Sequence, residues 1–180
     1  AVANYNFGVV PKKLTANQIE ELIDAFIDAG RRSKEAGFDG IQIFCSHGYL
    51  INQFLSPYIN QRTDEWGGTL ENRFRFLRSI YEGIRKKVGA DYPIIAKFPI
   101  EDFTNPGLST DDCIWLALQL QELGIDGFEI SGGMSTIDKN CVRAPIKTRS
   151  QEAYFLPYIG MLRRAGITKS LILVGGIRSK

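Results

Sequence analysis

The chain has 180 residues, 44% of them apolar and 11% aromatic, which is enough for one sizeable core in a single domain or part of a larger one. The formal net charge is +2, with acidic and basic residues interspersed, so nothing points to a nucleic-acid partner or an anionic membrane surface. No apolar run approaches the ~20 residues that a transmembrane helix needs.

The N-terminal residues lack the basic start and long apolar stretch of a signal peptide. The first residue is not Met, which suggests processing or a missing upstream segment. The cysteines are odd in number and far apart, so we expect no disulfide framework and predict a reducing, cytoplasmic location. They are Cys45, Cys113 and Cys141.

Amphipathic helices and short apolar strands alternate along the chain. After an N-terminal loop segment (1–14), a helix is expected from Thr15, which has the capping-box spacing to Gln18. Later helices are expected over 69–88, from 109 or 110 to 124, and over 151–165. Strands are expected over 38–46, 92–98, 125–131 and 170–176.

This alternation predicts right-handed βαβ units and a parallel sheet, which makes the fold class α/β. The pattern E-x-G-x-D-G-x-x-I occurs at 35–43 and again at 122–130, and a repeated unit favours a barrel or a simple wound sheet. A (β/α)₈ barrel takes about 250 residues. Four strands in one domain over 1–180 therefore predict half of a TIM barrel.

Several residues with useful chemistry follow these strands, where active sites of such folds lie. His47 can hydrogen-bond a carbonyl or act as an acid and base, and Tyr49 can give a proton. Lys97 is either a fixed positive charge or an amine nucleophile. Gly175 and Gly176 would let backbone N–H groups approach a phosphate.

Each of these residues also has a purely structural interpretation. His47 can be a buried histidine bonded to backbone, Tyr49 an amphipathic core residue, and Lys97 a lysine whose stem is buried while its ammonium reaches water. Glycine pairs also simply end strands. No metal is expected, because Cys45 and His47 have no second ligand pair, and no P-loop or G-x-G-x-x-G fingerprint follows a strand.

The polar segment 54–76 bridges the first strand to the second helix. We interpret it as a structured loop held by charge-assisted hydrogen bonds, in preference to a direct catalytic role. The side chains expected to hold it are Arg62, Asp64, Glu65 and Arg73.

The run "HGYLINQFLSPYINQRTDEWGGTLENRFRF" (47–76) resembles the signature of the Old Yellow Enzyme family of FMN-dependent NAD(P)H oxidoreductases. "PIIAKF" with "EDF", "GIDGFEISGG" and "LILVGGIRS" resemble later parts of that family in the same order. The resemblance implies an eight-stranded barrel with FMN at its carboxyl rim. It also implies that these are strands four to seven, with no counterpart of strands one to three and eight.

The family's chemistry implies a role for each matching residue. NADH or NADPH reduces FMN, which passes hydride to an activated small-molecule acceptor, as in an ene-reductase. By this resemblance His47 holds the acceptor oxygen and Tyr49 protonates the acceptor. Lys97 stands beside N1 and the C2 carbonyl of the flavin, where a positive charge stabilises the reduced form. Gly175 and Gly176 match the phosphate-binding turn.

One position departs from the family pattern. By the same resemblance, Phe44 is expected in the substrate pocket at a position where the family has a histidine, and a phenyl ring donates no hydrogen bond. Loss of one donor worth about 1.5–3 kcal/mol would weaken carbonyl polarisation roughly ten- to a hundred-fold. Some amine-oxidising relatives have a tyrosine there, so the acceptor need not be a simple enone. Lys97 replaces the commoner arginine, which keeps the charge but loses the bidentate fork.

Two other classes of function remain open on the sequence. A barrel aldolase would use Lys97 as a Schiff-base nucleophile. A non-catalytic half-barrel would form a homo-oligomer or pair with the missing half of a barrel, because it exposes two strand edges and an inner face. For the chain alone we expect weak FMN affinity.

Overall fold

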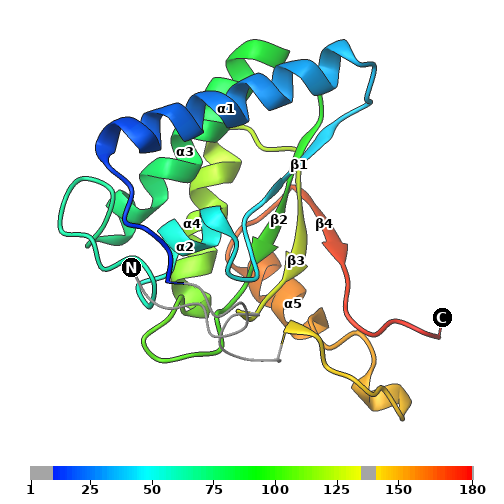
Figure 1. The fold of residues 1–180 in the computed structure, drawn as a ribbon. Coiled ribbons are helices and arrows are strands. Elements are labelled where there is room, and N and C mark those ends of the chain that lie inside the picture. The colour runs from blue at the N-terminus through cyan, green and yellow to red at the C-terminus, as the bar shows by residue number, and fades with distance from the viewer. Residues whose placement is uncertain (1–9, 135–140, 180) are drawn as a thin grey trace.

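The computed structural model describes residues 10–134 and 141–179. Its strands form one parallel sheet in the order β1-β2-β3-β4 (Figure 1). They are β1 (Ile41–Phe44), β2 (Ile94–Pro99), β3 (Gly127–Ser131) and β4 (Ser170–Leu173). The α/β prediction with four parallel strands is confirmed. Of the expected N-terminal loop, residues 10–14 form no helix or strand, and 1–9 lie outside the described residues.

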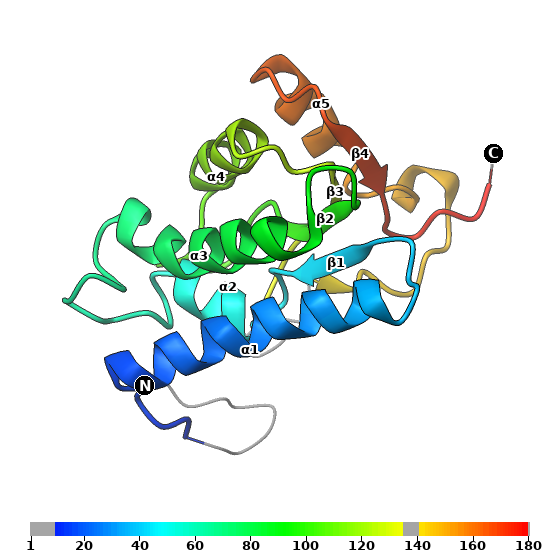
Figure 2. The ribbon, with the colours of Figure 1, turned by 90° about the horizontal axis from the view of Figure 1, so that it is seen from above.

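The strands form an arc, with α3, α4 and α5 along its outer side and α1 packed against α3 (Figure 2). Such an arc with helices outside is the arrangement of part of a (β/α) barrel. The helices are α1 (Ala16–Glu35), α2 (Leu50–Leu55), α3 (Leu70–Val88), α4 (Thr110–Glu122) and α5 (Leu156–Arg164), with a 3₁₀ turn η2 (Arg149–Gln151).

Three of the four predicted helix starts, those of α1, α3 and α4, agree with the structure. At α1 the Thr15 hydroxyl accepts from the Gln18 N–H at 3.2 Å and the Gln18 amide accepts from the Thr15 N–H at 3.0 Å, so the predicted capping box is present. Ser109 and Asp112 form a second capping box at α4. These reciprocal bonds satisfy N–H groups that the first turn leaves without helical partners.

Two segments differ from the prediction. Residues 50–55 form the short helix α2, which is too brief to give a periodic signal. The helix expected over 151–165 begins only at Leu156, after the separate 3₁₀ turn. Pro157 lies in the first turn of α5, where its missing N–H costs nothing, and this places the helix start.

The core lies between the sheet and the helices. Phe98 and Phe128 extend from neighbouring strands toward the helices and meet edge to face, with ring centroids 5.2 Å apart. Since strand side chains alternate, Lys97 and Glu129 lie on the opposite, inner face of the sheet. In a complete barrel, this face of the sheet would line the interior.

The loop over 54–76 is held largely as expected. Arg62 donates to Asp64 at 3.0 Å and to the Leu14 carbonyl at 2.8 Å. Arg73 instead donates to backbone, to the carbonyls of Leu55 at 2.7 Å and Gly68 at 2.6 Å. Arg62 thus ties the loop to the segment before α1, and Arg73 ties its end to the end of α2, which supports a structural role for the segment.

The three cysteines all lie in the described part of the chain and are free. Within the described ranges, no helix has both the length and the apolarity to cross a bilayer.

Candidate active site

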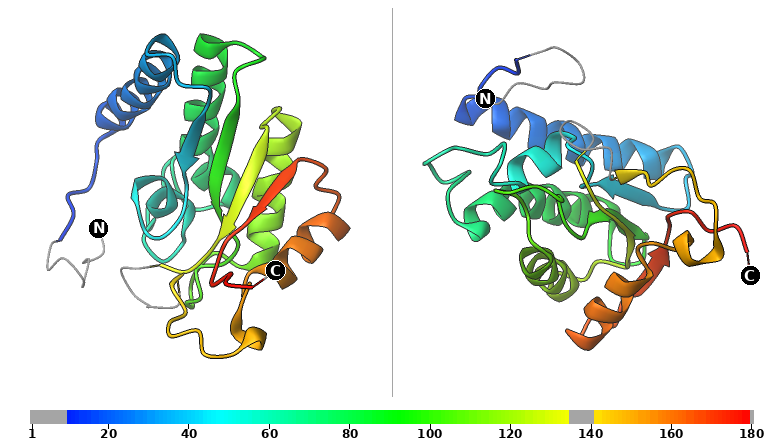
Figure 3. Two further views of the ribbon diagram at one scale, coloured as in Figure 1. Left: turned by 90° about the vertical axis from the view of Figure 1, so that its right-hand side faces the viewer. Right: turned by 90° about the horizontal axis from the view of Figure 1, so that it is seen from below.

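The carboxyl ends of the four strands meet at one edge of the sheet (Figure 3). A cavity of about 460 Å³ opens there, a size common among small-molecule sites. Five of the six residues predicted for the site line it: Phe44, His47, Tyr49, Lys97 and Gly175. The sixth, Gly176, is the next residue along the same turn.

The His47 ring is held by hydrogen bonds to Ser131 and to the Gly133 backbone. The backbone of His47 has φ 63°, an uncommon conformation for a residue other than glycine. Its Nε2 lies 2.8 Å from the Ser131 hydroxyl at the end of β3. Burial, followed by the charge of Lys97, lowers the pKa of His47 in spite of a hydrogen bond to the Gly133 backbone and the charge of Glu129. The imidazole is therefore neutral at pH 7, and one ring nitrogen carries a proton that it can donate.

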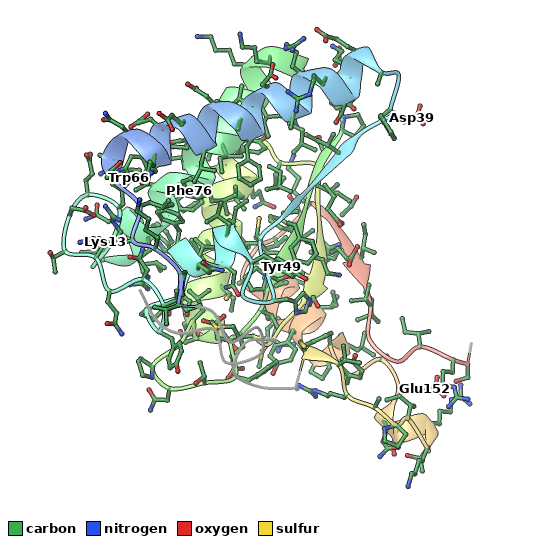
Figure 4. The ribbon with its side chains drawn as sticks, viewed as in Figure 1. Lys13, Asp39, Tyr49, Trp66, Phe76 and Glu152 are labelled. Atoms are coloured by element: carbon green, nitrogen blue, oxygen red, sulfur yellow. The ribbon has the colours of Figure 1, made fainter. Side chains whose placement is uncertain are left out.

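Tyr49 is the residue immediately before α2, and its side chain is 57% exposed. Figure 4 shows it near the carboxyl end of β1, on the turn into that helix. Its ring meets the ring of Phe44 edge to face, with centroids 5.0 Å apart. The phenol thus lies at the cavity and is accessible to a small molecule.

Phe44, the last residue of β1, is 38% exposed. Besides Tyr49, its ring lies 5.9 Å from the His47 ring. The ammonium of Lys97 lies 5.9 Å from the Phe44 ring centroid, within range of a cation–π contact. The position that departs from the family pattern therefore contributes a ring among the polar groups, with no hydrogen-bond donor.

Lys97 lies inside β2 and forms an ion pair with Glu129, its register partner on β3. Gln42 of β1 donates to the other carboxylate oxygen of Glu129 at 3.0 Å. Burial opposes ionisation of Glu129, but the bonds from Lys97 and Gln42 prevail and lower its pKa. The cavity lining therefore includes the Lys97 ammonium, with the Glu129 carboxylate paired to it.

Gly175 and Gly176 follow β4 with φ values of 106° and 70°, which favour glycine. A Cβ on Gly175 would lie only 2.7 Å from the Tyr154 ring, and one on Gly176 only 3.0 Å from Ile146. This turn has room for backbone alone, so its amide groups can approach a ligand closely. Such a backbone cradle fits a phosphate, and the Lys97 cation fits an electron-rich ring system.

Three polar residues of the site were missed in the sequence. Glu129 stands in "GFEIS" between the buried Phe128 and Ile130, and this alternation could have placed it on the inner face. Gln42 has the same signal, between the two isoleucines of "IQIF", whereas Ser131 at the end of its strand does not. They matter because of their partners on neighbouring strands, which only the register brings together.

The described residues include no group of three or more His, Cys, Asp and Glu side chains that could hold a metal ion. Of the two possible ligands considered in the sequence, Cys45 is fully buried. Burial raises the pKa of its thiol, which disfavours the thiolate that metals bind.

Comparison with known proteins identifies relatives of this chain. The model of the NADH:flavin oxidoreductase / NADH oxidase family matches residues 2–179. An NADPH dehydrogenase of Geobacillus sp. (strain WCH70) is 40% identical over 154 residues, which cover 86% of this chain and 42% of the relative. An NADH oxidase of Thermoanaerobacter brockii is 42% identical over 127 residues, 71% of this chain and 20% of the relative. The chain thus spans less than half the length of these relatives.

Two solved structures are similar to this chain in fold. A 2-naphthoyl-CoA reductase bound to 2-naphthoyl-CoA superposes with a TM-score of 0.80 and 36% identity, covering 89% of this chain and 24% of that one. An Old Yellow Enzyme homologue from Zymomonas mobilis shares the fold, with a TM-score of 0.72 and 24% identity over 96% of this chain and 45% of that one. FMN, with NADH or NADPH as reductant, is the cofactor set to which these findings point. The chain belongs to the NADH:flavin oxidoreductase / NADH oxidase family.

Proposed function

We propose that this chain carries the flavin- and acceptor-binding residues of an FMN-dependent NAD(P)H oxidoreductase that reduces an activated small-molecule acceptor. The observation that carries the proposal is the convergence of His47, Tyr49, Lys97 and Gly175 on one cavity at the carboxyl edge of the sheet. His47 and Tyr49 come from the loop after β1, Lys97 from β2 and Gly175 from the turn after β4, so several strands contribute, as in barrel enzymes.

Lys97 and the turn at Gly175 and Gly176 would hold FMN. The turn offers backbone N–H groups to the phosphate, and Lys97 places a positive charge beside the electron-rich edge of the ring. When bound, FMN supplies the transfer of hydride between the nicotinamide and the acceptor.

His47 and Tyr49 would act on the acceptor. On acceptor binding, the neutral imidazole of His47 would exchange one of its bonds, to Ser131 or to the Gly133 backbone, for a hydrogen bond donated to the acceptor's carbonyl oxygen. That bond would make the conjugated carbon more electrophilic. The Tyr49 hydroxyl gives its proton to the neighbouring carbon as negative charge develops there. Phe44 leaves the carbonyl with one histidine donor instead of two and offers its ring to a flat, conjugated acceptor. The solved relative bound to 2-naphthoyl-CoA makes aromatic thioesters reasonable acceptors to screen.

Two alternatives from the sequence are weaker. An aldolase needs a free amine, whereas the Lys97 ammonium is engaged by Glu129. A non-catalytic chain that only self-associates would not need His47, Tyr49 and Lys97 around one cavity. Trapping with borohydride and a keto substrate discriminates the first, since an aldolase would leave an adduct on Lys97.

Absorbance spectroscopy of the full-length protein that contains residues 1–180 tests the proposal. We expect a flavin band that survives dialysis, bleaches on anaerobic addition of NADH or NADPH, and returns when an enone or another conjugated acceptor is added. A protein that retains no FMN, or whose FMN is not reduced by either nucleotide, would refute it. The same chain is expected to work in a reducing, cytoplasmic setting.

A further inference from the structure

Glu129 lies at the centre of the inner face of the sheet. Strand register places Phe44, Lys97, Glu129 and Ile172 side by side across β1, β2, β3 and β4. The side chains of Lys97 and Glu129 are each only 19% exposed. Their ion pair is therefore shielded from water, and its charges act over a longer range than those of a surface pair.

Both carboxylate oxygens of Glu129 are engaged. Oε1 pairs with the Lys97 ammonium, and Oε2 accepts from the Gln42 amide at 3.0 Å. On the other side of the ammonium lies the Phe44 ring, 5.9 Å away. Lys97 is thus fixed by groups from β1 and β3, the strands on either side of its own.

The fold does not need the ion pair of Glu129 with Lys97 to hold β3 in place. Phe128 and Ile130, which flank Glu129, are fully buried against the helices and already anchor β3. Glu129 instead faces the inner side, next to the one cation that lines the cavity among the residues described. The negative charge of Glu129 therefore affects how much positive charge Lys97 presents to a ligand in the cavity.

We propose that Glu129 is a positioning residue and counter-ion that sets how much positive charge Lys97 presents to bound FMN. This inference rests on the proposed function. Reduced FMN and its complex with sulfite both carry negative charge near N1 and the C2 carbonyl, and a cation there stabilises both. A carboxylate paired with that cation moderates the effect, so the Lys97 and Glu129 pair adjusts the flavin potential as a unit.

Glu129→Gln separates charge from geometry, because glutamine has nearly the same shape and its amide oxygen still accepts from Lys97. With the negative charge gone, we expect sulfite to bind the FMN-loaded full-length protein about ten-fold more tightly, judged from Coulomb interactions at an effective dielectric near 20. The same ten-fold change in the reduction equilibrium raises the two-electron potential by about 30 mV. Sulfite titration followed by flavin absorbance and equilibration with a reference dye measure the two effects.

Two variants serve as controls. Glu129→Asp keeps the charge and should leave sulfite affinity within about three-fold of wild type, since one methylene changes the Coulomb energy little. Glu82→Gln removes a carboxylate from the exposed pair with Arg78 on α3 and should change nothing. A purely structural role for Glu129 would make the Gln and Asp variants behave alike.

The inference is overturned if Glu129→Gln leaves sulfite affinity and potential unchanged or lowers them, or if Glu129→Asp reproduces the effect of Glu129→Gln. A full-length protein that takes up no FMN overturns the proposed function and this inference together. FMN that is bound and reduced normally but does not respond to Glu129→Gln overturns the inference alone.

Discussion

Tyr49 presents its phenol to the cavity from the start of α2, beside the ring of Phe44. Replacing Tyr49 with Phe removes only the hydroxyl and leaves the ring contact. If the hydroxyl is the proton donor, acceptor reduction should fall by roughly 10²–10⁴-fold, the usual contribution of a general acid. Stopped-flow measurement should show reduction of FMN by NAD(P)H at the wild-type rate. Tyr58→Phe, a tyrosine outside this cavity, is the matched control, and wild-type turnover in Tyr49→Phe would rule out the role.

A substitution at Phe44 is expected to raise activity, whereas the one at Tyr49 lowers it. Phe44→His introduces a hydrogen-bond donor at the position where the family has one. For an enone acceptor we expect kcat/KM to rise roughly ten- to a hundred-fold, because one more donor to a desolvated carbonyl is worth about 1.5–3 kcal/mol. Steady-state kinetics with one enone and one aromatic thioester measures it. A loss of activity with both acceptors would mean that the ring itself is required.

His47 should make stability depend on pH. Its pKa lies below the ordinary value of 6.5 because burial and Lys97 disfavour the charged ring, so the unfolded chain binds the proton more readily. Stability that is present above pH ~6.5 is therefore lost as the pH falls from there toward the folded pKa. His47 is the only histidine in the chain. Urea unfolding at pH 5 and pH 7.5 should show this loss, and His47→Asn should reduce it.

At the scale of elements, Asp102 joins α2 to the loop between β2 and α4. Its buried carboxylate accepts from the Asn52 amide at 3.2 Å and from the Leu108 N–H at 2.8 Å. This bond to Asn52 holds the helix that follows Tyr49, so the loop after β2 helps to fix the start of α2. The position of the Tyr49 side chain therefore depends on the carboxylate of Asp102, which lies in the loop after β2.

Asp102→Ala should lower the free energy of unfolding by about 2–4 kcal/mol, because two buried donors lose their acceptor. Asp91→Ala, at an exposed position, should have little effect. Equilibrium urea denaturation of both variants makes the comparison. Equal stability of the two variants would show that the carboxylate does not anchor α2.

For the whole molecule, the open sheet has consequences. β1 and β4 form its edges in the described structure, and on its inner face Phe44 and Ile172 are 38% and 40% exposed. Exposed apolar side chains beside unpaired strand edges favour association. We expect the 180-residue chain, expressed alone, to form oligomers and to lose FMN on dialysis, since parts of the flavin's surroundings in a barrel would be missing. Light scattering after size exclusion checks the first point, and a stable monomer would contradict it.

Periodicity and caps were enough to predict four helix–strand units and their parallel sheet, because Thr15, Ser109 and the apolar stripes act locally. Local signals failed at α2, which is only 6 residues long, and at 151–165, where Pro157 places the helix start. The site residues were found partly by position after strands and partly by resemblance to a family. Glu129 was overlooked because a single polar residue in an apolar strand has no partner visible in the sequence.

The sequence by itself determined the order of elements, the parallel sheet and the edge at which His47, Tyr49 and Gly175 would meet. Each of these follows from contacts between residues close in the chain, or from the rule that parallel strands share their carboxyl edge. Only the tertiary structure decided that Lys97 is paired with Glu129, and that Ser131 holds His47. Those contacts depend on strand register, which brings together residues 32 and 84 positions apart.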